Sequence, residues 1–501
     1  MASSRPPKRL VVFCDGTWVG RETTVANAPA SNIRQLANMV GEVNYIDSTT
    51  TATDSSPILV HPIITSSPNI TAGYQEGVGL NKTFLEYIWD GATASAIGDE
   101  IIAVYRFIVE HYTSDHEIWL FGFSRGAFTV RCVAGMINNC GIVRNLPSYT
   151  PDQLHRLCYD VFRTYRSPLP QDSPHSRNSE HLKGNAARVW QVKRPIRFVG
   201  IIDTVGALGI PRLSSGTGFD WAEFQFFDQT ASSVIQHIYH APALHDRLWT
   251  FQPCLVFESE DEGKDKPVIT QRWFPGTHYD LGRMTFRFIR QRPSSWIEGV
   301  LGFIPDLLSR TIYPNEVLSD CVLRFVLEGV RDLDNGVLMP GVEAEIERLN
   351  RRIVFPALNT TGSGDIYTSV LNYAPAGVLL GSIQRVSRLF ASALNSFLPR
   401  LGTNIQALFG IKTIVGILTA TADRRIPGTQ ADVFLYQSKQ VVTIEGEQGT
   451  VVVSERAKME GVNEWGRERY ESKTYESFLL WREVFGRTEV NGAHSGVNRG
   501  G

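Results

Sequence analysis

The sequence predicts an α/β fold, in which a mainly parallel β-sheet is flanked by helices. Short apolar runs rich in β-branched residues alternate, along the first half of the chain, with segments whose apolar residues recur at helical spacing. Strands separated by helices favour a parallel sheet with helices on both faces. In addition, a serine flanked by glycines joins one of these strands directly to the helix that follows it.

The individual elements follow from these patterns. The predicted strands are Leu10–Cys14, Ile58–Ile64, Glu117–Phe121, Pro195–Ile202 and Val268–Phe274, the last clear strand. The predicted helices are one that Ser31 can cap, Asp99–His111 and Ala127–Asn138. Residues 165–185 are rich in Pro, Ser, His and Asn and are predicted to form an exposed loop, whereas residues 290–430 are predicted to be mostly helical.

Composition and charge exclude several classes of protein. The 501-residue chain has 49 Lys and Arg against 51 Asp and Glu, a net charge of −2, and it lacks the basic stripe that nucleic-acid binding requires. Its six cysteines are scattered without a CxxC pair, which favours reduced thiols. We find neither a signal peptide nor an apolar stretch of about 18 residues that could span a membrane. We therefore expect a cytoplasmic protein with no cofactor and no metal.

The segment Gly122–Gly126 (G-F-S-R-G) matches the G-x-S-x-G motif of serine hydrolases. The motif alone is weak evidence, but here it follows an apolar strand and precedes a helix. In this arrangement the sharp turn pushes the serine side chain above the edge of the sheet, and Gly122 and Gly126 allow the backbone and the helix to approach closely. The sequence therefore predicts an α/β-hydrolase fold with Ser124 as its nucleophile.

A serine nucleophile needs a base, and the base needs an orienting acid. In this fold the acid and then the histidine follow the serine along the chain. Asp203 ends an apolar strand, where an acid without a partner would be costly to bury, although a helix cap is the alternative interpretation. His278 is the histidine that lies downstream of both on a loop at a strand end, and Asp280 is a second candidate for the acid. The histidines expected to be structural lie in a predicted helix–turn region: His237, His240 and His245.

The oxyanion hole of this fold uses the amide after the nucleophile and one from an earlier loop. These are the N–H of Arg125 and the N–H of Gly16 or Thr17, in the loop that begins at Asp15. An ordinary turn at Asp15 and Gly16 is an equally good interpretation of the local sequence.

Eight short segments, spread over roughly residues 8–330, occur in the order typical of one protein family. They are Val11–Trp18, Tyr74–Gly79, Ala103–Phe107, Phe121–Ala127, Ile202–Val205, Ala243–Arg247, Trp273–His278 and Leu318–Asp320. In these segments the chain resembles a family of α/β-hydrolase domains that is also described as the catalytic domain of type VI secretion phospholipase effectors (Tle-type lipase effectors).

The resemblance implies a triad of Ser124, Asp203 and His278, and it favours Asp203 over Asp280 as the acid. It also implies ester hydrolysis, with phospholipids as the substrate of the bacterial effector members. The chain departs from the family pattern after His278. The family usually continues Ser-Asp-Val-Gly-Gly-Gly, whereas this chain continues Tyr-Asp-Leu-Gly-Arg-Met, so that two glycines are lost and Arg283 is gained.

We divide the chain into an α/β-hydrolase catalytic domain (1–330), a helical accessory or lid region (331–440) and a C-terminal extension (441–501) with a disordered tail from residue 486. Within the second part, Ile383–Gly416 has apolar residues near helical spacing with Arg385 and Arg388 beside them. This pattern is typical of a helix packed over the active site as a lid, and also of a helix that lies on a membrane surface.

The leading functional hypothesis is a serine hydrolase that cleaves carboxylic esters, especially those of lipids, through a Ser-His-Asp triad and an acyl-enzyme. A small-molecule esterase or thioesterase and a non-catalytic scaffold with the same fold are the alternatives. The expected partners are a lipid or small ester substrate and, through a peripheral contact, a membrane, but no nucleic acid.

Overall fold

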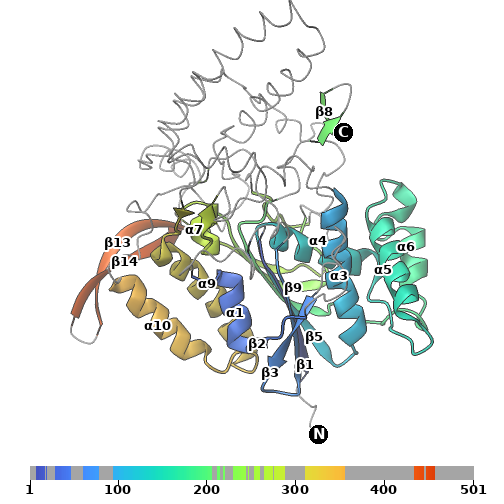
Figure 1. The fold of residues 1–501 in the computed structure, drawn as a ribbon, viewed down its shortest axis with the longest axis horizontal. Coiled ribbons are helices and arrows are strands. Elements are labelled where there is room, and N and C mark those ends of the chain that lie inside the picture. Colours follow the sequence, from blue (N-terminus) through green and yellow to red (C-terminus); the bar gives the residue numbers. More distant parts are fainter. Residues whose placement is uncertain are drawn as a thin grey trace, which may run out of the picture.

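The computed structural model describes most of residues 7–355 and one hairpin near the C-terminus (Figure 1). The described residues are 7–16, 19, 29–46, 60–77, 94–205, 212–214, 218–220, 230–243, 246, 253–259, 265–274, 276–287, 311–355, 434–444 and 447–456. Several expectations from the sequence lie outside these residues: those for Thr17, His245, the segment 383–416 and the tail from residue 486.

An eight-stranded mixed sheet forms the centre of the molecule, with strand order β10-β9-β6-β5-β1-β4-β3-β2. Its strands are β1 (Lys8–Cys14), β2 (Gly41–Val43), β3 (Val60–Thr65), β4 (Ile70–Gln75), β5 (His116–Phe123), β6 (Ile196–Ile202), β9 (Ile235–Ala241) and β10 (Val268–Gln271). Neighbouring strands from β10 to β4 are parallel, and the pairs β4–β3 and β3–β2 are antiparallel. The predicted α/β class and mainly parallel sheet are confirmed, whereas the antiparallel edge was not expected from the sequence.

Helices cover both faces of this sheet (Figure 1). One face carries α3 (Ala94–His111), α4 (Arg125–Cys140) and α5 (Pro151–Tyr165), followed along the chain by α6 (Arg177–Lys183). The other face carries α1 (Asn32–Val40), α7 (His278–Gly282), α9 (Glu316–Asp334) and α10 (Val342–Val354). The remaining strands in the described part of the chain form three antiparallel pairs: β7 (Arg212–Ser214) with β8 (Gly218–Asp220), β11 (Phe286–Arg287) with β12 (Thr311–Ile312), and β13 (Phe434–Ile444) with β14 (Glu447–Arg456).

Strand β1 shows how the sequence divides the core into two layers. Successive side chains of a strand point to opposite faces, so a strand that is covered on both faces is continuously apolar. Leu10 and Val12 pack in the cluster that contains α3, α4 and α5, whereas Val11 and Phe13 pack in the cluster that contains α1, α9 and α10. The uninterrupted apolar run that predicted this strand is thus a consequence of its central position.

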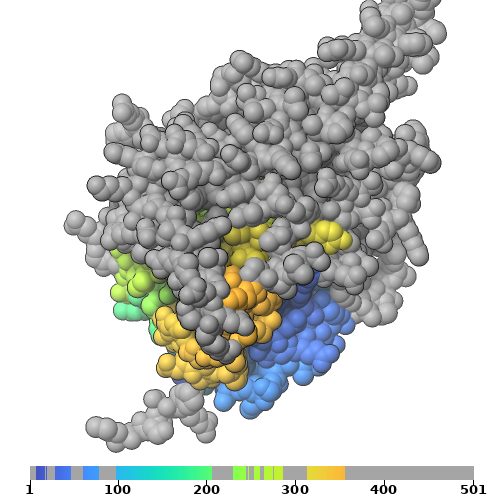
Figure 2. Space-filling view, turned by 90° about the vertical axis from the view of Figure 1, so that its left-hand side faces the viewer, coloured from blue at the N-terminus to red at the C-terminus, as the bar shows by residue number. Residues whose placement is uncertain are grey.

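Helices α9 and α10 belong to the same core as the sheet. Phe325 and Val326 of α9 are buried in one cluster with Phe121 of β5 and Phe198 of β6. On the face shown in Figure 2, the gold-to-orange segment with α9 and α10 lies beside the blue N-terminal elements. The domain boundary expected after residue 330 falls inside α9.

The secondary structure differs from the sequence prediction in several places, and strands β2 and β4 and helix α5 were not expected from the sequence. Residues 165–185, expected to be a loop, contain α6, which Ser176 caps and which Ser179 ties to the carbonyl of Asn139 at 2.6 Å. His237 and His240 lie in strand β9 rather than in a helix–turn region. The ring of His240 is buried, and its Nδ1 lies 2.8 Å from the Oε1 of Gln271. Because this core position is polar, the sequence does not show the apolar pattern by which a strand is recognised.

Another difference is the hairpin of β13 and β14, which follows the segment 268–274 that was predicted to be the last clear strand. Among the helices in the described part of the chain, none combines the length and the apolar character needed to cross a bilayer.

Candidate active site

Ser124 occupies the sharp turn between β5 and α4. Its backbone has φ 56° and ψ −119°, and Arg125, the next residue, begins the helix. The turn is held because the Ser124 N–H donates to the carbonyl of Ile202 at 3.0 Å and the N–H of Phe128 donates to the carbonyl of Ser124 at 3.2 Å. A residue other than glycine at positive φ costs about 1–3 kcal/mol and persists only where its surroundings determine it.

The glycines on both sides of Ser124 allow this turn to close. A Cβ atom on Gly126 would overlap the carbonyl oxygen of Cys14 and lie 2.6 Å from that of Asp15. A Cβ atom on Gly122 would lie 2.6 Å from the backbone nitrogen of Ala127. Because these obstacles are backbone atoms, they cannot rotate away, and the turn has no room for a side chain at either position.

The imidazole of His278 lies between Ser124 and Asp203. Its Nε2 is 2.7 Å from the Ser124 Oγ, and its Nδ1 is 2.7 Å from the Asp203 Oδ2. A carboxylate only accepts hydrogen bonds, so Nδ1–H donates to Asp203, and Nε2 is left to accept the hydrogen bond of the Ser124 hydroxyl. The residues Ser124, His278 and Asp203 are 6%, 2% and 0% exposed.

Asp203 directly follows β6 and also adopts a positive φ, 38°. Its backbone N–H donates to the carbonyl of Ala241 at 2.9 Å, and its Oδ1 accepts the N–H of Ala243 at 2.8 Å. These contacts with the end of the neighbouring strand β9 and with the segment that follows it aim Oδ2 at His278. A buried carboxylate without such donors would be costly, and here both oxygens are satisfied.

Two residues that hold His278 were not identified from the sequence. Asp246 accepts the backbone N–H of His278 at 2.9 Å, and the ring of Phe123 stacks on the imidazole with 4.7 Å between the ring centroids. Asp246 lies in one of the segments that resemble the family, and Phe123 lies inside the G-x-S-x-G motif. Both signals were therefore present, but neither indicated which group the side chain would contact.

Asp280 does not reach the imidazole of His278 through any contact that we observe; instead it caps the helix that carries it. Its Oδ2 accepts the N–H and the hydroxyl of Thr277, each at 2.9 Å, and its Oδ1 accepts the N–H of Asn315 at 2.8 Å. Burial raises the pKa of Asp280 to about 7, against the opposing effect of these hydrogen bonds. The structure thus brings Asp203, and not Asp280, to the imidazole.

The loop after β1 passes directly beside the nucleophile. A Cβ atom on Gly16 would lie 2.6 Å from the ring of Phe123 and 3.1 Å from the Cβ of Ser124. Asp15 shapes this loop: its Oδ1 accepts the Gly16 N–H at 2.9 Å, and its Oδ2 accepts the hydroxyls of Ser31 and Tyr74. Burial raises the pKa of Asp15, these hydrogen bonds oppose the increase, and the resulting pKa is about 6.

The side chain of Arg125 binds to helix α3. Its Nη2 donates to the Glu100 Oε1 of α3 at 3.0 Å, and burial lowers the pKa of the guanidinium to about 9. Its backbone N–H belongs to the first turn of α4, where helix amides favour negative charge. In the part of the chain that the structure describes, no group of three His, Cys, Asp or Glu residues is arranged to hold a metal ion, and all six cysteines are free thiols.

Comparison with known proteins relates the chain to relatives of low sequence identity. It is 25% identical over 194 residues to the uncharacterized protein YEL023C of Saccharomyces cerevisiae, a match that covers 36% of this chain and 26% of the yeast protein. The chain therefore spans about a quarter of that relative's length.

Two solved structures also show similarity. One is the Tle1 effector bound to the VgrG spike of the type VI secretion system (16% identity, 55% of this chain and 50% of that chain, TM-score 0.24). The other is an uncharacterized protein from Pseudomonas aeruginosa (13% identity, 69% of this chain and 50% of that chain, TM-score 0.31).

The family model that matches is described as the Tle1-like catalytic domain of type VI secretion phospholipase effectors, and it matches residues 8–295. The match includes Ser124, Asp203 and His278 and covers more than half of the chain. The protein belongs to the family of Tle1-like catalytic domains of type VI secretion phospholipase effectors.

Proposed function

We propose that the protein is a serine hydrolase with an α/β-hydrolase fold that cleaves carboxylic esters of lipids, phospholipids in particular. The observation that supports this most is the continuous chain of hydrogen bonds from Ser124 through His278 to Asp203. Membership of a phospholipase effector family supports the lipid substrate.

The geometry supports a two-step acyl transfer. His278 Nε2 takes the hydroxyl proton as the Ser124 Oγ attacks the ester carbonyl, and Asp203 stabilises the imidazolium that forms. His278 then gives this proton to the leaving alcohol, and an acyl group remains on Ser124. Water, activated by the same imidazole, releases the acid and regenerates the serine.

The oxyanion of the tetrahedral intermediate needs backbone donors. The Arg125 N–H, in the first turn of α4, is one of them. The second belongs to the loop after β1, at Gly16 or Thr17. Since the Gly16 N–H donates to the Asp15 carboxylate, the N–H of Thr17 is the better candidate for the second donor, and Asp15 acts by shaping the loop.

The test of the nucleophile is the variant Ser124→Ala. Loss of a nucleophile removes the covalent path, so we expect labelling by a fluorophosphonate probe to disappear and kcat to fall roughly 10⁶-fold. The matched control is Ser232→Ala, because Ser232 is a buried serine whose hydroxyl has no hydrogen-bond partner among the described residues. Labelling that persists in Ser124→Ala would reject Ser124 as the nucleophile.

The substrate class is tested by two parallel rate measurements. The wild-type protein is offered a short-chain nitrophenyl ester in solution and a long-chain phospholipid in vesicles, and the products are identified by lipid profiling. Faster turnover of the vesicle lipid supports the lipase, and turnover of the soluble ester alone indicates a small-molecule esterase or thioesterase. A non-catalytic scaffold would turn over neither substrate and would not be labelled.

A further inference from the structure

The helix that carries His278 is too short to fix its own position. Helix α7 has five residues, and His278 is the first of them. An isolated helix of this length is unstable, because forming its first turn fixes the backbone of several residues in return for a single hydrogen bond. The position of the imidazole therefore depends on the groups that hold α7, and these contact the middle of the helix and its C-terminal end.

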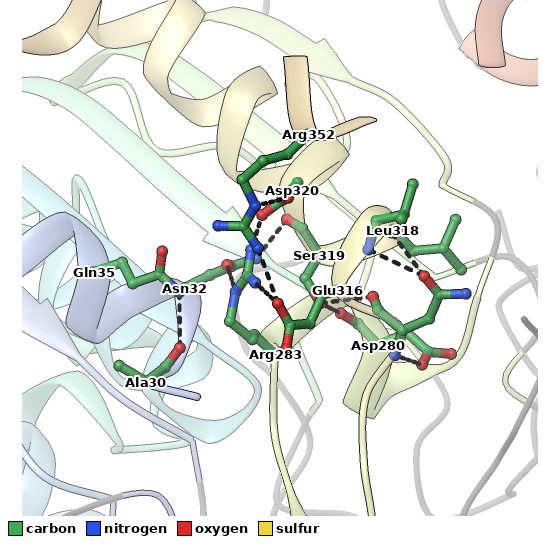
Figure 3. Close-up of polar contacts among 12 residues, drawn as sticks. Ala30, Asn32, Gln35, Asp280, Arg283, Glu316, Leu318, Ser319, Asp320 and Arg352 are labelled. Atoms are coloured by element: carbon green, nitrogen blue, oxygen red, sulfur yellow. Dashed lines mark hydrogen bonds and ion pairs between the residues drawn. The ribbon is translucent and has the colours of Figure 1, made fainter. Parts of the chain in front are cut away.

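The first turn of α9 binds the middle of α7 (Figure 3). The Asn315 N–H donates to the Asp280 carboxylate at 2.8 Å, and the Ser319 hydroxyl donates to the Asp280 carbonyl at 2.5 Å. Asn32 of α1 bridges the two helices, because its Nδ2 donates to the carbonyls of Leu281 (2.7 Å) and Ser319 (2.9 Å). These contacts locate α7 along α9, and most of them depend on residues beyond 295, where the family model match ends, although Ser319 lies in the segment Leu318–Asp320 that resembles the family.

Arg283 closes the C-terminal end of α7. It adopts the left-handed conformation with φ 56° and ψ 46°, at a position where the family pattern has glycine. Its guanidinium is 1% exposed, donates from Nε to the Asn32 Oδ1 at 3.0 Å, and forms an ion pair with Asp320 of α9. Asp320 is held from the other side by the Nε of Arg352 of α10 at 3.1 Å (Figure 3).

Both members of this ion pair are buried, which makes the link stiff. Separating the two side chains would leave each with one counterion fewer in the core, Arg283 with Glu316 at 3.6 Å and Asp320 with Arg352 at 3.1 Å, so their separation in the folded protein is costly. The left-handed backbone, which arginine adopts less readily than glycine, is maintained because this ion pair holds the side chain. The end of α7 is thereby fixed to a helix that is itself anchored in the core by Phe325 and Val326.

We propose that Arg283 and Asp320 are positioning residues for His278. Their buried ion pair fixes the end of α7 on α9 and so keeps the imidazole within hydrogen-bond distance of both Ser124 and Asp203. The proposal rests on the proposed function, in which this distance controls proton transfer. A displacement of about 1 Å in such a group costs about 10²-fold in rate.

The experiment compares two buried aspartates of the same helix. Asp320→Asn removes the charge that pairs with both Arg283 and Arg352, and the control Asp334→Asn removes the charge that pairs with Arg9 (2.9 Å) at the other end of α9. We expect both variants to lose stability in thermal unfolding. Only Asp320→Asn should lower kcat on a short soluble ester, by about 10- to 100-fold, with little change in KM. Equal kcat values for the two folded variants would overturn the proposal.

Two variants of Arg283 separate positioning from folding. Arg283→Gly restores the family residue and relieves the backbone, so it should fold, but it should lower kcat like Asp320→Asn. Arg283→Lys keeps the charge and should retain more of kcat than Arg283→Gly. A folded Arg283→Gly with the wild-type kcat, or equal losses in both variants, would overturn the proposal.

A spectroscopic arm distinguishes failure of this proposal from failure of the proposed function. In protein labelled with ¹⁵N-histidine, the ring resonances of His278, assigned with His278→Gln, report its hydrogen bonds without turnover. We expect Arg283→Gly and Asp320→Asn to shift these resonances and Asp334→Asn to leave them unchanged. If the wild type hydrolyses no ester, the proposed function fails, and unchanged resonances in all three variants would reject the positioning role as well.

Discussion

Two residues of the candidate site, Ser124 and Asp203, share a backbone conformation that side-chain-bearing residues usually avoid. Their φ angles are 56° and 38°. Each follows a central parallel strand, and the positive φ turns the chain so that the side chain stands at the carboxyl edge of the sheet, where ligand groups gather in α/β folds. The strain is maintained by hydrogen bonds to neighbouring strands, such as that from the Asp203 N–H to Ala241 at 2.9 Å.

The contacts of Asp203 and Asp280 lead to different expectations for the variants in which each is replaced by asparagine. Asp203→Asn should lower kcat by about 10⁴-fold while the protein remains folded, because an amide presents the wrong partner to the imidazole Nδ1–H. Asp280→Asn should act mainly on stability, at about 1–3 kcal/mol, because an amide cannot accept all the hydrogen bonds that reach the Asp280 carboxylate. Steady-state kinetics and urea unfolding of both variants check this, and a larger kcat loss in Asp280→Asn would reverse the assignment of the acid.

At the scale of elements, the contact between α4 and β1 determines where the nucleophile stands. Gly126, in the first turn of α4, lies against the carbonyl groups at the end of β1. The hydroxyl of Ser124 and the loop of Asp15 and Gly16 are therefore set by one packing contact between a helix and a strand. This close approach explains why the residue at position 126 is glycine, whereas Gly122 lies against the backbone of Ala127.

Gly126→Ala tests this contact, and Gly341→Ala is its control. A Cβ atom at Gly126 overlaps backbone that cannot yield without moving the helix, so we expect a loss of about 1–3 kcal/mol in stability together with a lower kcat. At Gly341 no atom lies within 4 Å of the added Cβ, and its φ of −91° suits alanine. Urea unfolding and ester hydrolysis should therefore leave Gly341→Ala close to the wild type. A Gly126→Ala variant as stable and active as that control would show that α4 is not held as closely as the structure indicates.

Helix α9 illustrates how an element outside the matched family segment supports a site inside it. Its apolar face packs on the sheet beside Phe121 and Phe198, and its polar N-terminal turn binds α7. One amphipathic helix thus supplies both the core contact and the hydrogen bonds. The sequence pattern predicted helix here, but the pattern contains no information on which turn would meet α7.

At the scale of the whole molecule, the burial of Asp15 and Asp280 makes stability depend on pH. The pKa of Asp15 is raised to about 6 and that of Asp280 to about 7, by burial in both cases. Unfolded aspartates titrate near 4, so between about pH 4 and pH 7 the folded protein binds more protons than the unfolded chain. The contribution of these two groups to the free energy of unfolding therefore decreases as pH rises through this window.

Asp280→Asn isolates one of these contributions. The variant has no carboxyl group to ionise at this position, so the stability of the wild type relative to the variant should decrease between about pH 4 and pH 7. Urea midpoints of both proteins across this range measure the difference. A wild type whose advantage grows as pH rises would mean that the ionised form is the one the fold stabilises, and that the pKa of Asp280 is lowered.

The sequence by itself determined the features that are local along the chain. The strands β1, β5 and β6 and the helices α3 and α4 are readable because central strands are continuously apolar and helices keep one apolar face. The turn at Ser124 is also local, since strand, glycines and helix adjoin. Asp203 and His278 could be named because each follows a strand end and the order along the chain is constrained.

Only the tertiary structure decided which of these residues meet. His278 joins residues 75 and 154 positions away, Asp203 and Ser124, and residue order cannot encode such distances. Strand β9 was missed because its core position His240 is polar, and Asp246 because a buried carboxylate is recognised only by what donates to it. The expectations for Thr17 and for the segment 383–416 remain predictions. The anchoring of α7 by Arg283 and Asp320 depends on three helices meeting at one point, and that juxtaposition is a property of the packed chain rather than of any segment of it.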